Sequence, residues 1–254
     1  MHIRPAKPSD FSTVADFGAK GFWNDVVFEW LHPRKEEYPE HFRNSILQRR
    51  LAQYYSGYQL FVIELDPDDE GYDGEVEWSS YSKHYGRRET YLVNRVEIES
   101  FLRTVQFKYW DIITADKSVN YARTRSFNAS PSKFDNIDEH WHLHYLSVDP
   151  GFQCRGIGGR LLQWGLEQAQ KEGVPVTLHA SPIGACLYRR RGFRLYGNEP
   201  PIDGVYFEGY CFIWEPKGME GRWGYCDNIS SIQEEEALKE LEKALDEKIS
   251  SFKS

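Results

Sequence analysis

Residues 140–172 constrain the fold of this chain more than any other part of its sequence. Apolar and polar residues alternate over 140–148, as in a β-strand, and Asp-Pro-Gly at 149–151 ends the strand. Glycines at 156, 158 and 159 follow, and apolar residues then recur at helical spacing up to Glu172. This order predicts a strand, a glycine turn and an amphipathic helix, and therefore an α/β fold.

The glycine turn has a functional and a structural interpretation. Glycines at a helix start let backbone N–H groups approach a ligand, and the helix dipole favours a phosphate or pyrophosphate there. Two common phosphate motifs are excluded, because Leu161 replaces the third glycine of a dinucleotide fingerprint and no Gly-Lys-Ser/Thr follows. A tight turn with close helix packing would need the same glycines, so the turn alone leaves both interpretations open.

Residues around the turn resemble the GNAT superfamily of N-acetyltransferases. Gln153-x-x-Gly156-x-Gly158 after a strand is similar to the acetyl-CoA-binding motif of that family. The later Ala185-Cys186-Leu187-Tyr188 with Gly192-Phe193 is similar to its Ala-x-x-Leu-Tyr-x-x-x-Gly-Phe segment, and Arg4-Pro5-Ala6 resembles its opening strand. The resemblance is close over residues 140–197 and absent over 86–136 and 217–254.

The resemblance implies a fold and a domain organisation. The expected fold is α/β and GNAT-like (acyl-CoA N-acyltransferase), a mixed, mostly antiparallel sheet of about seven strands with helices on both faces. Residues 1–216 would form the N-acetyltransferase domain, with a helical insertion at about 86–136. Residues 217–254 would form a tail whose amphipathic helix either docks on the domain or serves self-association, so a homodimer stays open.

Local patterns predict the other elements. Ser9 is the expected N-cap of a helix with apolar residues at helical spacing: Phe11, Val14, Ala15, Phe17 and Gly18. A second helix is expected over 36–56, and strands over 2–5, 60–65, 75–82, 174–180 and 193–196. Residues 88–113, 158–172 and 183–191 are expected to be helical. The aromatic-rich stretch 22–30 and the polar stretch 120–136 are expected to be loops, and residues 205–214 one long strand.

The resemblance also implies which residues bind the co-substrate, acetyl-CoA. Its pyrophosphate would contact the backbone of the turn at Gln153, Cys154, Arg155, Gly156, Ile157, Gly158 and Gly159. Its pantetheine arm would lie against Leu146, Ser147 and Val148, and Ser181 and Tyr188 complete the expected cofactor-binding set. A backbone N–H near Leu146 would stabilise the oxyanion of a tetrahedral intermediate.

Three histidines, His140, His142 and His144, alternate along the strand and therefore share one face. They could be hydrogen-bonded core residues, metal ligands or acid–base groups. No carboxylate or further histidine has the motif spacing to complete a zinc site, so no metal is predicted.

The acid–base interpretation gains from a second resemblance. His142-Leu143-His144 is similar to the His-x-His strand of the arylalkylamine N-acetyltransferases, whose paired histidines relay the amine proton through water. An ammonium of pKa near 10 must lose a proton before it attacks a thioester, and an imidazole of pKa about 6.5 can accept it. His142 or His144 is therefore the expected base, with Glu139 and Asp138 as alternative carboxylate bases. Tyr188 is the expected general acid for the departing thiolate, or else a tyrosine packed beneath residues 189–191.

The expected activity is that of an acyltransferase of the N-acetyltransferase type, which moves acetyl from acetyl-CoA directly to a small-molecule primary amine. A protein lysine or N-terminal acetyltransferase and a non-catalytic acyl-CoA-binding module are the alternatives. The formal net charge of −8 argues against a nucleic-acid or anionic-membrane partner. No apolar run approaches a membrane span, and the 4 cysteines form no C-x-x-C pair. A cytoplasmic protein with reduced thiols is expected.

Overall fold

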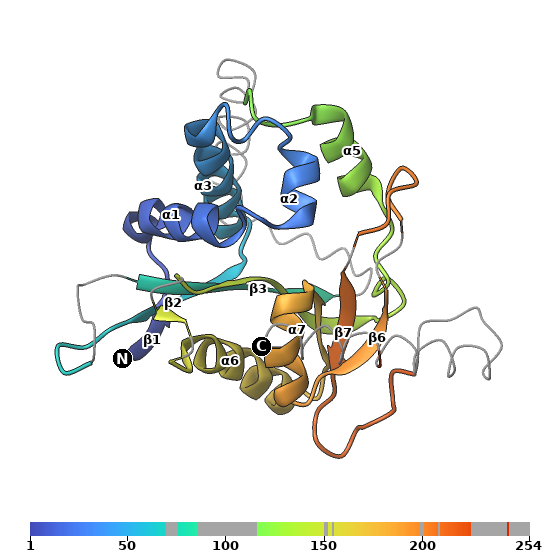
Figure 1. Cartoon of the computed structure of the whole chain (residues 1–254). Coiled ribbons are helices and arrows are strands. Elements are labelled where there is room, and N and C mark those ends of the chain that lie inside the picture. The colour runs from blue at the N-terminus through green and yellow to red at the C-terminus, as the bar shows by residue number, and fades with distance from the viewer. Residues whose placement is uncertain are drawn as a thin grey trace, which may run out of the picture. The chain divides into compact units, whose positions relative to one another are not determined.

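The computed structural model describes residues 1–69, 76–85, 116–149, 152–153, 155–198, 201–207, 209–224 and 243, with the backbone alone for 76–85, 182 and 183. The helix expected over 88–113, the tail helix and Cys154 lie outside the described residues. The chain divides into two compact units, Met1–Ser82 with Arg87–Asn128 and Tyr145–Leu162, and Lys83–Gly86 with Ala129–His144 and Gln163–Ser254. Figure 1 shows the chain and labels most of its helices and strands.

Three antiparallel strands form the sheet of the first unit. Strand β1 (His2–Pro5) pairs with β2 (Gln59–Glu64), and β2 pairs with β3 (Val76–Tyr85). Opposite residues in this register include Ile3 with Ile63. β2 is the central strand of this sheet because it pairs on both sides, and its residues 60–63 are buried.

Helices α1 (Phe11–Gly21), α2 (Val26–Leu31) and α3 (Pro39–Tyr55) provide the rest of the first core. The helical spacing predicted for α1 is confirmed, since all five apolar positions named above are buried. Phe11, Val14 and Phe17 pack with Leu60 and Val62 of β2. A second cluster joins the three helices and contains Ala15, Phe28, Phe42 and Ile46.

The expected start of α1 is wrong by one residue. Residues Pro8–Asp10 form a 3₁₀ turn, and Asp10 rather than Ser9 precedes the helix as its N-cap. The carboxylate of Asp10 accepts the backbone N–H of Lys7 at 2.7 Å and pairs with Arg4 at 2.8 Å. These two contacts close the 3₁₀ turn that precedes the helix.

Two segments predicted as loops contain helices, and one predicted strand is shorter. The carboxylate of Asp25 accepts the N–H groups of Val27 and Phe28 at 3.0 and 3.1 Å and starts α2 within the aromatic stretch. Asn120 caps α5 (Tyr121–Ala129) by accepting the N–H of Arg123 at 3.2 Å. Such side-chain caps start helices whose composition alone resembles a loop. Strand β7 begins only at Tyr210, because residues 202–205 form a turn with positive φ at 203 and 204.

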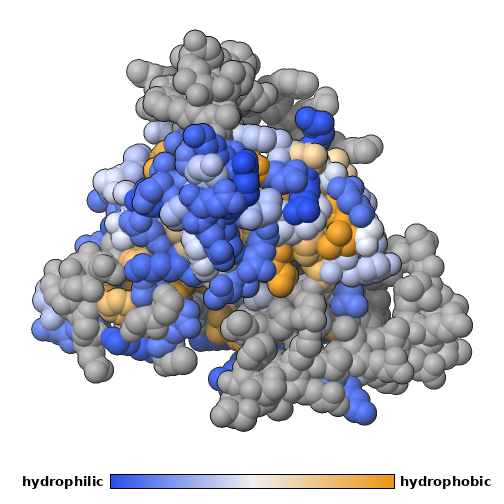
Figure 2. Space-filling model, turned by 45° about the horizontal axis from the view of Figure 1, so that its top comes forward, coloured by the Kyte–Doolittle hydropathy of each residue, from blue (hydrophilic) through white to orange (hydrophobic). Residues whose placement is uncertain are grey.

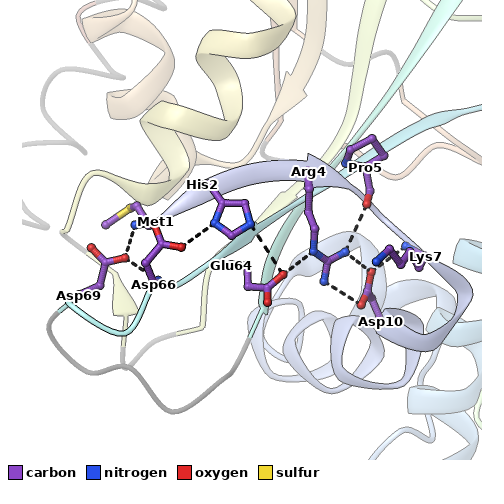
Figure 3. A network of polar contacts seen from close by, with 9 residues as sticks. All are labelled: Met1, His2, Arg4, Pro5, Lys7, Asp10, Glu64, Asp66 and Asp69. Atoms are coloured by element: carbon purple, nitrogen blue, oxygen red, sulfur yellow. Dashed lines mark hydrogen bonds and ion pairs between the residues drawn. The ribbon is translucent and has the colours of Figure 1, made fainter.

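A network of charges anchors the first strand (Figure 3). Arg4 on β1 bridges Glu64 on β2 at 2.5 Å and Asp10 at 2.8 Å. The terminal amine of Met1 pairs with Asp66 and Asp69, and further contacts come from His2, Pro5 and Lys7. The network joins the edge strand to the turn after β2.

Strands β4 (Glu139–Ser147), β5 (Val176–Ala180), β6 (Arg194–Asn198) and β7 (Tyr210–Trp214) belong mainly to the second unit. β4 pairs with β5 in parallel, whereas β5 with β7 and β7 with β6 are antiparallel. Helix α6 (Ile157–Glu172) connects β4 to β5, and α7 (Pro182–Arg190) packs against β5 and β7. The α/β class is therefore confirmed, while one continuous sheet of about seven strands stays a prediction.

The described surface is largely hydrophilic in the face that Figure 2 shows, with hydrophobic residues in smaller areas. Large apolar side chains that the described residues expose are Val26, Tyr121, Val205 and Tyr206. None of the described helices combines the length and the apolar character that crossing a membrane requires.

Candidate active site

The predicted glycine turn lies in the first unit, between the end of β4 and the start of α6. The side-chain amide of Gln153 donates to the carbonyl oxygen of Val148 at 3.0 Å. This bond draws the chain back toward the end of the strand. Gly156 has a φ of +81°, in the left-handed region that glycine adopts without strain, and its carbonyl accepts the first helical N–H, from Arg160, at 3.1 Å.

The turn has the geometry that an anion requires. A Cβ placed on Gly156 would meet nothing within 4 Å, so open space lies beside this residue. The first turn of an α-helix leaves its N–H groups without partners inside the helix, and here these belong to Ile157, Gly158 and Gly159. The positive end of the helix dipole adds to their attraction for an anion. These features fit the pyrophosphate of a coenzyme A molecule.

The end of β4 is held tightly by α1. Ser147 is buried, and a Cβ on Gly21 would lie 2.7 Å from its hydroxyl oxygen, so glycine alone allows this approach. Lys20 pairs with Asp149 at 2.9 Å across the same contact. Leu146 and Val148 are half-buried. The residues expected beside the pantetheine arm thus lie on a strand end whose position is fixed.

The second unit contains a cluster that we call the histidine face, made of His140, His142 and His144 on β4 with Thr177 and His179 on β5. The prediction that the three β4 histidines share a face is confirmed, since the ring centroids of His140 and His142 lie 6.2 Å apart and those of His142 and His144 4.6 Å apart. His179 was not predicted and lies 5.1 Å from His142. The parallel register, in which His142 is opposite Thr177, brings it there.

Three rings of the histidine face are held through Nδ1. His140 Nδ1 lies 3.1 Å from the carbonyl oxygen of Ile137 and therefore donates to it. His142 Nδ1 lies 2.7 Å from the hydroxyl of Thr177, and His179 Nδ1 lies 3.7 Å from the thiol sulfur of Cys211. A shared anchoring nitrogen orients these rings in a consistent way and makes Nε2 the nitrogen suited to proton exchange.

Burial differs along the histidine face. His140 and His142 are buried, His144 is half-buried, and His179 is exposed to solvent. The dense protein surroundings of His179 disfavour its charged form and lower its pKa to about 4, although its side chain reaches solvent. The buried His142 therefore has two more accessible imidazoles near it, those of His144 and His179.

Phe134 covers this cluster and was also not predicted. It precedes β4, is buried, and has its ring centroid 5.6 Å from His142 and 5.0 Å from His179. Tyr196 of β6 stacks on it at 5.6 Å. An apolar side chain placed here keeps water away from His142. Residues 131–138 have no motif, so only the fold identifies Phe134 as part of the site.

In the part of the chain that the structure describes, no group of three or more His, Cys, Asp or Glu side chains is arranged to hold a metal ion. The histidine face presents a hydroxyl, a thiol and a carbonyl to its imidazoles. These partners suit hydrogen bonding and proton transfer.

The two predicted residues around α7 have defined positions. Ser181 is the N-cap of α7, and its hydroxyl accepts the N–H of Gly184 at 3.4 Å. Tyr188 is buried with its ring 5.7 Å from that of Phe193 and 6.4 Å from that of Phe212. Burial raises the pKa of Tyr188, so the phenol keeps its proton at neutral pH. The described contacts of Tyr188 do not include the histidine face.

A strand that carries histidines, a glycine turn and an amphipathic helix thus follow one another in this α/β protein. The family model described as "Acetyltransferase (GNAT) domain" matches residues 109–195, which contain β4, α6, β5 and α7. Over these residues the chain is similar to the GNAT superfamily of acetyltransferases.

One curated protein and several solved structures are also similar to this chain. An uncharacterized N-acetyltransferase of Schizosaccharomyces pombe is 34% identical over 53 residues, which cover 21% of this chain and 23% of that protein. The structure is similar to that of a histone acetyltransferase HPA2 and related acetyltransferase from Corynebacterium glutamicum, with a TM-score of 0.55, 20% identity, and coverage of 84% of this chain and 94% of that one. An N-acetyltransferase from Staphylococcus aureus Mu50 has a TM-score of 0.50, 16% identity and coverage of 84% and 100%. The two structures show a shared fold.

Proposed function

We propose that this protein is an N-acetyltransferase that transfers an acetyl group from acetyl-CoA directly to a small primary amine. The observation that carries the proposal is the composition of β4. This strand carries His142 and His144, which would act as acid–base groups, and leads, after Ser147, into the glycine turn that precedes α6. Deprotonation of an amine and binding of an acyl-CoA are the two tasks of such an enzyme.

Acetyl-CoA would bind through the backbone of the turn. The N–H groups of Ile157, Gly158 and Gly159 would donate to the pyrophosphate, and the open space beside Gly156 admits its approach. The pantetheine arm would follow Leu146, Ser147 and Val148. Gln153 would act on the shape of the turn, because its side-chain amide is engaged by Val148.

His142 or His144 would remove the proton from the ammonium group of the acceptor. The neutral amine then attacks the thioester carbonyl, and a tetrahedral oxyanion forms that a backbone N–H near Leu146 would stabilise. Collapse of this intermediate breaks the C–S bond, and the nitrogen passes its second proton to the departing sulfur, so the products are the amide and the thiol of coenzyme A. The hydrogen bond between Nδ1 of His142 and the hydroxyl of Thr177 would hold the ring in place for removal of the ammonium proton.

Tyr188 would hydrogen-bond to the departing sulfur. Its raised pKa keeps the phenol in its donating form. The same shift makes full proton transfer to a thiolate of pKa about 8.5 less favourable than it would be for an ordinary tyrosine. We therefore expect Tyr188 to stabilise the leaving group by a hydrogen bond, so Tyr188→Phe should lower kcat less than His142→Ala does.

Two alternatives make different predictions. A protein lysine or N-terminal acetyltransferase would acetylate peptides, and the Corynebacterium protein described as a histone acetyltransferase is a similar fold with that substrate class in its name. A non-catalytic acyl-CoA-binding module would bind coenzyme A without turnover. The resemblance of the His-x-His strand to arylalkylamine N-acetyltransferases favours the small amine.

A thiol-release assay with acetyl-CoA tests the proposal across arylalkylamines, polyamines, peptides and alcohols. We expect turnover with primary amines and at least tenfold lower kcat/KM with peptides. Calorimetric titration with coenzyme A measures binding separately. Preferred turnover of peptides would replace the small amine by a protein substrate, binding without turnover would favour the binding module, and absence of coenzyme A binding would contradict all three functions.

A further inference from the structure

Besides the expected pair, His142 and His144, the histidine face contains the imidazole of His179 on β5. His179 lies 5.1 Å from His142, and His142 lies 4.6 Å from His144, measured between ring centroids. At these separations the ring nitrogens are within reach of a hydrogen bond or a single bridging water. His142 and His144 on β4 and His179 on β5 thus form one cluster across two paired strands.

The three rings of this cluster differ in burial. His144 is half-buried, His142 is buried beneath Phe134, and His179 is exposed to solvent. A proton that reaches His142 cannot pass directly into bulk water, because this ring is shielded. His179 provides the exposed imidazole next to it.

We propose that His179 is the proton outlet of the active site and that Thr177 is a positioning residue that keeps His142 in the tautomer this outlet requires. The inference rests on the proposed acetyl transfer. The ligand class is the ammonium form of the acceptor, whose proton leaves through His142 and His179 to water or to a buffer base.

The transfer balances in protons and electrons. The N–H bond of the ammonium group breaks, the electron pair stays on the amine, and the proton passes, directly or through His144, to Nε2 of His142. His142 keeps its Nδ1–H donated to Thr177 throughout and hands the Nε2 proton to Nε2 of His179. His179 releases the proton to solvent, and both imidazoles return to the neutral state.

The anchors on Nδ1 support this route. Thr177 holds Nδ1 of His142, and Cys211 lies beside Nδ1 of His179, so both rings use the same nitrogen for exchange. His140, whose Nδ1 donates to Ile137, lies 6.2 Å from His142 on the side away from His179.

The outlet is tested by buffer rescue. In a weakly buffered solution we expect His179→Ala and His179→Gln to lower kcat at least about tenfold, with the KM for acetyl-CoA unchanged. Imidazole added to His179→Ala should restore kcat as its concentration rises, because it takes the proton from His142. The control His41→Gln replaces a histidine outside the histidine face and should keep wild-type kcat.

The positioning role of Thr177 can be tested without turnover, by observing the tautomer of His142. Nitrogen-15 NMR of wild-type His142 should show the Nδ1–H tautomer, Thr177→Ser should keep it, and Thr177→Val should lose it. Thr177→Val should also lower kcat, whereas Thr177→Ser should restore most of it. Thermal unfolding of each variant shows whether it folds.

The outcomes separate this inference from the proposed function. If the wild-type protein turns over no amine, acetyl transfer fails and the outlet fails with it. Wild-type turnover combined with an unchanged kcat in His179→Gln, or a loss in His179→Ala that imidazole does not rescue, overturns the outlet alone. A His142 tautomer that Thr177→Val leaves unchanged overturns the role of Thr177.

Discussion

The glycine turn and the histidine face are constructed in opposite ways. The turn consists of neighbouring residues, and its chemistry comes from backbone N–H groups and a helix dipole. The histidine face combines side chains from β4 and β5 with Phe134 from the segment before β4 and Cys211 from β7. One region depends on local backbone conformation, and the other on strand register and packing.

This difference determines what a substitution does. In the turn, a side chain can change with little effect as long as the glycine conformation and the space beside Gly156 remain. In the histidine face, the hydrogen-bonding atoms belong to the side chains themselves. Loss of one of them leaves a buried partner such as Thr177 without its hydrogen bond. The predictions below test this contrast, beginning with the largest effect.

His142→Ala should separate the two regions most clearly. Removal of the base should lower kcat by about 10²–10⁴-fold, or about 3–5 kcal/mol in the barrier, while coenzyme A affinity stays within twofold of wild type. Steady-state thiol release and calorimetric titration measure the two effects on the same preparation. His41→Ala serves as the control, and parallel losses of kcat and affinity would show that the turn depends on the histidine face.

Phe134→Ala should damage the histidine face through packing. A buried phenylalanine reduced to alanine typically costs about 3–5 kcal/mol, and Phe134 contacts His140, His142, His179 and Tyr196. Chemical denaturation measures the change in the free energy of unfolding. Phe134→Leu keeps most of the apolar volume and should lose less than half as much. Equal stability of wild type and Phe134→Ala would contradict the covering role of Phe134.

The same contrast explains what could be predicted from the sequence. The turn, the strand before it and the helix after it were predicted correctly because their signals are local: a period-two pattern, an Asp-Pro-Gly stop and glycines at a helix start. The three histidines of β4 were placed on one face for the same reason. Strand register is not local, so His179 and Thr177 could not be assigned to the site.

The two helices that were predicted as loops, α2 and α5, also depend on a local signal, namely their N-cap residues. Helices α2 and α5 begin at Asp25 and Asn120, whose side chains accept backbone N–H groups, yet both helices lie in stretches whose composition is typical of loops. Neither helix has the apolar periodicity of α1 or α6. In these two segments the N-cap residues indicate a helix, whereas the spacing of the hydrophobic residues does not.

A histidine of the first unit tests whether burial alone makes the protein sensitive to acid. His32 is fully buried, and its burial, together with nearby Arg49, lowers its pKa to about 4. The unfolded chain binds this proton at about pH 6.5, so the folded state loses stability as the pH falls from about 6.5 to about 4, by at most about 3 kcal/mol. His179 acts in the same direction but less, since solvent screens its exposed ring.

Denaturation of wild type and His32→Gln between pH 7.5 and 4.5 measures this effect. The variant should be less stable at pH 7.5 because its packing against Phe28 and Phe42 changes, and its stability should depend less steeply on pH. His41→Gln is the matched control and should keep the wild-type slope. A slope in His32→Gln as steep as in wild type would assign the acid sensitivity to other groups.

Gly156→Ala should have the smallest effect on the fold and a selective effect on the turn. A residue with a Cβ at a φ of +81° costs about 1 kcal/mol, and no atom within 4 Å adds a clash. The new methyl group would project into the space proposed for the pyrophosphate, so coenzyme A affinity should fall about tenfold, equivalent to about 1.4 kcal/mol. Gly57→Ala is the control, because Gly57 has a φ of +83° and equally open surroundings but lies outside the turn. We expect both variants to lose a similar amount of stability and only Gly156→Ala to lose affinity for coenzyme A. This result would show that the turn binds the cofactor, because the strain of a positive φ is the same in both variants.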